Sequence, residues 1–179
     1  MDALLGPLFA LVCGRDPQHL WAPDGTVLPC CQRCTGLYAG AAAAFVLLAV
    51  LRPRASARFL WVHGAFLLAM APQGFHLVYQ NELLRVVSGT LFAFGLVAFL
   101  MPEAKREELR GATWWYAAGM GATALMLPLL GMWGGVAGAL LLRVLALAGL
   151  AVYTGLVARF AGACVVRVWR RLAWAEAEA

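Results

Sequence analysis

Five long stretches without a charged side chain dominate this sequence. They cover residues 34–51, 59–81, 86–102, 111–142 and 144–158. A bilayer core about 30 Å thick needs about 20 apolar residues in a helix, and most of these stretches are long enough. Charged residues make up 13% of the 179-residue chain, against about 25% in soluble domains. The sequence therefore predicts an all-α polytopic membrane protein and excludes a soluble domain.

Charged residues and prolines divide the stretches into five predicted transmembrane helices. The fourth stretch is too long for one helix, and the glycine-rich segment 131–135 predicts a turn inside it. The predicted spans are residues 34–51, 59–80, 84–101, 113–130 and 136–160. We expect three parts: an N-terminal half-helix and Cys-rich loop (1–34), a five-helix bundle (35–160) and an amphipathic C-terminal tail (161–179).

The two ends of the chain are predicted to lie at the membrane surface. Segment 3–12 is apolar but too short to cross a bilayer, and Asp2 stands where a secretory signal carries a basic residue. We expect a re-entrant or interfacial half-helix that carries Cys13 toward the outer side. In the tail, arginines alternate with Trp169, Trp174 and aliphatic residues, which is typical of a helix lying along the inner interface.

The basic residues predict the direction of the bundle, because most of them fall on one side. Those on the first side are Arg52, Arg54, Arg58, Lys105, Arg106, Arg110, Arg159, Arg167, Arg170 and Arg171, and those on the second are Arg15, Arg33 and Arg85. The positive-inside rule places the first side, with the C-terminus, in the cytoplasm. The net charge of +5 then reflects topology and attraction to lipid head groups rather than nucleic-acid binding.

Four of the five cysteines lie within 22 residues, on the predicted outer side. Such clustering argues against isolated packing residues, although a structural disulfide is one alternative. Cys31-x-x-Cys34 has the spacing with which two thiolates bind one zinc or another thiophilic ion, and Cys13 can supply a third thiolate. We expect His76 or His19 to be the fourth ligand.

A second interpretation of the same residues is redox chemistry. A C-x-x-C pair at the outer mouth of a helical bundle also suits thiol–disulfide exchange with a membrane quinone. The Arg33 cation and the start of a helix would favour the attacking thiolate of Cys31 or Cys34. The sequence leaves open whether the protein is an enzyme. It contains no hydrolase or NTPase motif.

Arginines within or beside the spans suggest a third class, a small transporter or lipid-binding scaffold. Arg143 lies inside a predicted span, where it faces the bundle or snorkels to the outer surface. With Arg33 and Arg85 it would form a cationic rim suited to an anionic small molecule or lipid. Tyr38, on the same segment as Arg33, is a further candidate ligand-binding residue. The pair Gly36-x-x-x-Gly40 predicts close helix packing.

The segment 29–40 resembles the hallmark of a known family. It reads P-x-C-x-R-C-T-G-x-Y-x-G, like an uncharacterised family of small prokaryotic integral membrane proteins, number two thousand and eighty-five in the domain-of-unknown-function series. Cys13 and the segment 84–89 resemble two further family elements. Gly14 stands where the family usually has His, so His76 or His19 would replace the missing ligand. The resemblance implies a prokaryotic cytoplasmic (inner) membrane protein and supplies no activity.

Overall fold

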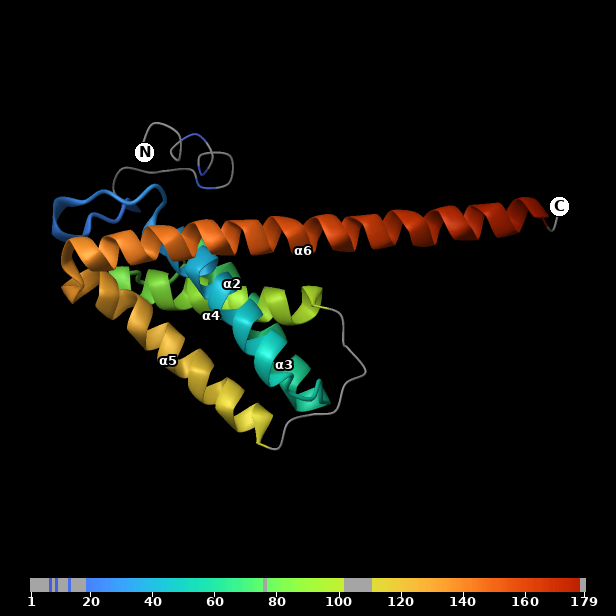
Figure 1. Ribbon diagram of the computed structural model, residues 1–179, viewed down its shortest axis with the longest axis horizontal. Helices are drawn as coiled ribbons and strands as arrows, with labels where there is room; N and C mark the ends of the chain where they lie inside the picture. Colours follow the sequence, from blue (N-terminus) through green and yellow to red (C-terminus); the bar gives the residue numbers. More distant parts are fainter. Residues whose placement is uncertain are drawn as a thin grey trace.

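The protein is an all-α bundle with an irregular loop before α2 (Gln32–Leu51) at one end (Figure 1). The computed structural model describes Pro7, Phe9, Cys13 and residues 19–75, 77–101 and 111–177. Its elements are η2 (Pro23–Gly25), α2 (Gln32–Leu51), α3 (Ala57–Gly74), α4 (Glu82–Leu100), α5 (Ala112–Trp133) and α6 (Gly135–Ala177). Of the predicted half-helix 3–12 only Pro7 and Phe9 are described, and both are helical.

Four of the described helices are long and apolar enough to cross a membrane: α2, α4, α5 and α6. They match the first, third, fourth and fifth predicted spans. The second prediction, α3, is an 18-residue helix that does not meet this composition test, because it includes polar residues such as Arg58, His63 and Gln73. The structure thus confirms the all-α class, and four of the five predicted spans are helices that could cross a membrane by their length and composition.

α3 nevertheless extends from one end of the bundle to the other, as its contacts show. Near its start, His63 Nε2 lies 2.8 Å from the hydroxyl of Tyr116, close to the beginning of α5. At its last turn, the Gln73 carbonyl accepts a 2.9 Å hydrogen bond from Arg33, at the beginning of α2. We call the end at which α2 begins the cysteine end, and the opposite end the Tyr116 end.

Glycines bring α2 and α4 into close contact. A Cβ atom on Gly36 would collide with the backbone carbonyl of Val86, and one on Gly89 would collide with the backbone carbonyl of Arg33. Thr90, beside Gly89, donates from its hydroxyl to the carbonyls of Val86 (2.9 Å) and Gly36 (3.3 Å). The predicted packing role of the Gly36 face is therefore confirmed, and it operates within this chain.

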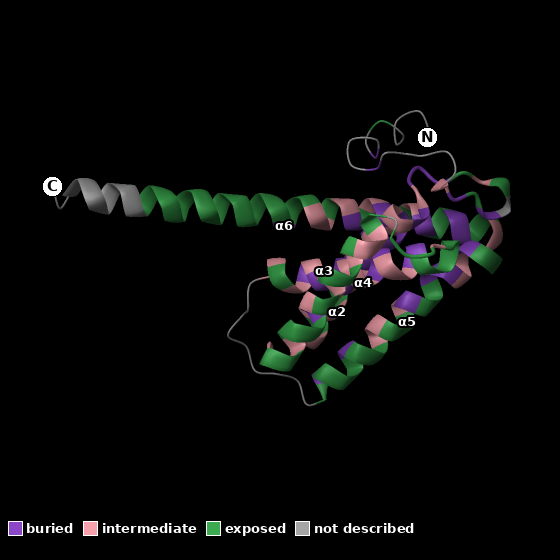
Figure 2. Cartoon of the chain, turned by 180° about the vertical axis from the view of Figure 1, so that it is seen from behind, coloured by how far each residue is buried: buried purple, intermediate pink, exposed green. Residues whose placement is uncertain are grey.

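The predicted turn between the last two spans is confirmed, since α5 ends at Trp133 and α6 begins at Gly135, which has φ +56°. α6 then runs 43 residues without a break, or about 64 Å at 1.5 Å per residue, twice the thickness of a bilayer core. Its second half extends beyond the other helices (Figure 1), and residues 157–170 are exposed (Figure 2). Residue 160 therefore marks no helix boundary, and the interfacial position of the tail stays a prediction.

Candidate metal centre

The loop before α2 is fastened to the cysteine end of the bundle. Its two ends pair, since Leu28 N donates to the Trp21 carbonyl (2.7 Å) and Leu20 forms an antiparallel bridge with Cys31. Trp21 is 4% exposed and belongs to a core cluster with side chains of α5 and α6. Arg143 on α6 donates to the carbonyl of Val27 (2.7 Å). These contacts fix the position of the chain as it enters α2.

The first turn of α2 places two cysteines side by side. Cys31 is the N-cap residue, and Cys34 stands three positions later, the separation of the two residues that interact in a capping box. The Cys31 carbonyl accepts the backbone N–H of Thr35 (2.8 Å), which closes the first turn. The positive end of the helix dipole favours thiolates at this place. The C-x-x-C spacing thus acts through local helix geometry.

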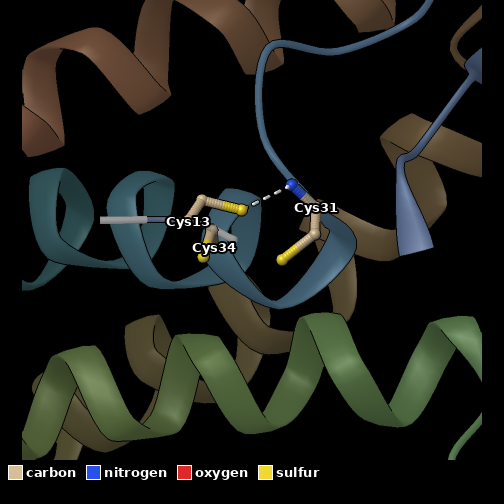
Figure 3. Close-up of side chains that lie close together, drawn as sticks. All are labelled: Cys13, Cys31 and Cys34. Atoms are coloured by element: carbon tan, nitrogen blue, oxygen red, sulfur yellow. Dashed lines mark hydrogen bonds between the residues drawn. The ribbon is translucent and has the colours of Figure 1, made fainter. Parts of the chain in front are cut away.

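Cys13 completes a cluster of three sulfurs. The Sγ atoms of Cys13, Cys31 and Cys34 all lie within 4.8 Å of one another, and Figure 3 shows them gathered beside the first turn of α2. Cys13 is 3% exposed, and its sulfur accepts a 3.4 Å hydrogen bond from the backbone N–H of Cys31. Behind it, the Phe9 ring packs edge-on against Tyr38 at 5.3 Å.

The geometry and chemistry of the cluster fit a thiophilic ion. Tetrahedral zinc with Zn–S bonds of about 2.3 Å separates its sulfurs by about 3.8 Å, so only a small contraction is required. No disulfide joins the cysteines that the structure describes. The hydrogen bond with Cys13 raises the pKa of the Cys31 thiol, and partial burial adds to the shift. A metal ion would therefore displace protons on binding.

Of the two histidines predicted as the fourth ligand, only His19 is described, and it lies outside this cluster. In the described part of the chain, no fourth His, Cys, Asp or Glu joins the three sulfurs. His19 lines a neighbouring pocket, and His76 lies outside the described residues. Cys30 is fully buried with its sulfur 3.3 Å from the Thr35 hydroxyl, and Cys164 is exposed on α6.

Two of the predicted rim arginines meet beside the cluster, through a residue that the sequence did not single out as a partner. The Gln80 side-chain oxygen accepts hydrogen bonds from Arg33 Nη2 (2.6 Å) and Arg85 Nε (3.1 Å). Gln80 is held by a hydrogen bond from its Nε2 to the Gln73 carbonyl. Neither arginine forms an ion pair with a described residue, so two cations converge on a neutral oxygen. Arg143 is engaged separately, with the loop.

The helices and the sulfur cluster define a multi-pass membrane protein with a three-cysteine site that could hold a metal ion. Residues 13–99 match the profile of a family described as predicted membrane protein (DUF2085). Over this segment the chain matches that family, as its resemblance indicated. The match contains all three cysteines of the cluster and stops before α5. No match is found among the curated proteins or the solved structures.

Proposed function

We propose that the protein binds one thiophilic metal ion, zinc by the chemistry of its ligands, through Cys13, Cys31 and Cys34. The observation that carries the proposal is the convergence of three sulfurs within 4.8 Å from two segments of the chain. The ion would join the N-terminal segment to the start of α2. A dithiol redox pair needs only Cys31 and Cys34 and does not account for the third sulfur.

We further propose that the site faces the outside of a prokaryotic cytoplasmic membrane. Arg52, Arg54 and Arg58 lie at the turn between α2 and α3 or beside it, at the end of the bundle opposite the cysteines. With five crossings the positive-inside rule places that turn and the C-terminus in the cytoplasm. The alternating direction of α2, α3 and α4 supports this orientation, because Arg33, Gln73 and Gln80 meet at one end.

The fourth coordination position decides whether the ion is structural or reactive. A structural zinc site is closed by four protein ligands, whereas a catalytic site keeps one position for water or substrate. His19, in the described loop, and His76 are the candidates for closure. Replacing each with Ala and measuring zinc affinity separates the cases: a drop with one histidine indicates a closed shell, and no drop with either indicates an open position.

Elemental analysis of the purified chain tests the metal proposal. We expect about one zinc per chain in the wild type and background content in Cys31→Ser/Cys34→Ser. Cys164→Ser and Cys30→Ser are matched controls, because both remove a thiol outside the cluster, and they should retain the metal. Equal metal content in the wild type and the double variant would contradict the proposal.

Redox chemistry remains as a second candidate on the same geometry, because Cys31 and Cys34 are close enough to form a disulfide after a small movement. It predicts a Cys31–Cys34 disulfide whose formation follows the redox state of the quinone pool. Alkylation followed by a mass measurement reports this state directly. Thiols that stay reduced under oxidising conditions would leave metal binding as the function.

A further inference from the structure

A polar pocket lies beside the sulfur cluster at the cysteine end. Its volume is about 500 Å³, and its walls come from His19, the first residue of α2 and the chain from Val78 to the start of α4. Gln32, which forms part of the wall, directly follows the proposed metal ligand Cys31. The pocket is therefore adjacent to the metal centre without containing any of its three sulfurs.

Two side chains in the wall are buried and still have hydrogen-bonding capacity toward the pocket. Gln32 is 5% exposed, and its side chain makes no hydrogen bond to any residue that the structure describes. Arg85 is 7% exposed and uses only Nε, in its bond to Gln80. The amide of Gln32 and the Nη atoms of Arg85 are not among the fully buried, unpaired atoms, so a ligand in the pocket can reach them. These two residues place an amide and a guanidinium in the pocket wall.

The charge around the pocket favours an anion. Arg33 binds the same Gln80 oxygen as Arg85, so two guanidinium groups lie close together with no carboxylate paired to either among the described residues. Guanidinium groups bind phosphate and carboxylate oxygens in a planar, two-point arrangement. Glu82 is exposed on the pocket wall, so it weakens the attraction for an anion without neutralising either arginine directly.

We propose that this pocket binds the phosphate or carboxylate group of a small ligand, held by Arg85 and Gln32, with Arg33 adding positive charge from behind Gln80. The group can come from a soluble anion or from a lipid head group of the outer leaflet, because both present the same oxygens. The site is separate from the sulfur cluster and binds its ligand with or without the metal ion.

Calorimetric titration with inorganic phosphate tests the proposal on the full chain, purified in a detergent without phosphate. We expect saturable binding by the wild type and binding at least about tenfold weaker in Arg85→Gln. Glu82→Gln should bind phosphate about two- to fivefold more tightly, the size of an exposed charge interaction. Because Glu82 is exposed, this second variant keeps the test informative if Arg85→Gln fails to fold. Arg54→Gln, at the opposite end, is the matched control and should bind like the wild type.

Two further arms identify the source of the anion and the independence of the site. In phospholipid nanodiscs, phosphate binding should be weaker than in the phosphate-free detergent if head groups occupy the pocket, and the two affinities should be equal if the ligand is soluble. Phosphate binding should survive chelation of the metal. Loss of binding on chelation would place the anion on the metal and overturn the proposal, as would equal affinity in the wild type, Arg85→Gln and Glu82→Gln.

Discussion

The two ends of the bundle bury polar side chains in opposite ways. At the Tyr116 end, His63 is 2% exposed, and both ring nitrogens have partners at 2.8 Å: the Phe59 carbonyl and the Tyr116 hydroxyl. At the cysteine end, the Tyr38 hydroxyl, Arg33 Nε and the Gln73 side-chain oxygen are buried without a hydrogen-bond partner in the described structure.

This difference distinguishes polar groups that packing explains from polar groups that packing does not explain. Buried polar groups in folded proteins almost always have partners, and a membrane interior makes an unpaired group more costly because no water replaces the partner. The His63–Tyr116 pair is complete, so packing explains it. The cysteine end has unpaired groups near three convergent sulfurs that could hold a metal ion, and packing alone does not explain these groups.

The largest expected effect is the loss of the metal ion. An ion that binds only the folded state at a thousand times its dissociation constant stabilises it by about 4 kcal/mol. Chelation of the wild type should therefore lower the thermal unfolding temperature, whereas chelation of Cys31→Ser/Cys34→Ser should leave it unchanged. Tyr116→Phe, altered at the other end, should respond to chelation like the wild type. An equal change of unfolding temperature on chelation in the wild type and the cysteine variant would contradict a metal site at the cysteine end.

Gly89→Ala should have the next largest effect. The added Cβ would collide with the backbone carbonyl of Arg33, so α2 must move at the cysteine end, at a cost of about 1–3 kcal/mol. Zinc content should fall as well, because Arg33 lies between the proposed ligands Cys31 and Cys34 in the sequence, so a shift of its backbone moves both. Gly121→Ala, where no described atom lies within 4 Å of the new Cβ, is the matched control and should keep both stability and metal. Wild-type stability in Gly89→Ala would show that the helix contact is not tight.

The same substitution made at both ends should give, at the Tyr116 end, an effect like that of Gly89→Ala and, at the cysteine end, the smallest effect. Tyr116→Phe removes the partner of a buried His63 nitrogen and should cost about 1–3 kcal/mol. Tyr38→Phe removes a hydroxyl that has no partner in the described structure and should change the stability of the metal-free protein by less than about 0.5 kcal/mol. Denaturation in mixed micelles measures both. Equal costs would contradict the contrast drawn between the two ends.

The sequence predicted most of the secondary structure because its signals are local. Uncharged stretches predicted the four helices that could cross a membrane, and the glycines at 131–135 predicted the turn between α5 and α6. α3 is the exception: its polar residues lower its hydropathy, yet His63 is buried against another helix. His63 lowers the mean hydropathy of α3, and burying its polar ring costs free energy. The hydrogen bond with Tyr116 offsets that cost, and only the structure shows this contact.

The candidate site likewise has a part that local sequence predicts and a part that depends on tertiary structure. Cys31 and Cys34 are one helical turn apart, so their spacing alone predicted that their sulfurs would lie together. That Cys13 joins them, and that Gln80 brings Arg33 and Arg85 together, depends on segments far apart in sequence. The sequence by itself determined the membrane class and the local thiol pair. Only tertiary packing, through the close α2–α4 contact and the fastened loop, decided which residues share the site, because convergence depends on the relative positions of whole helices.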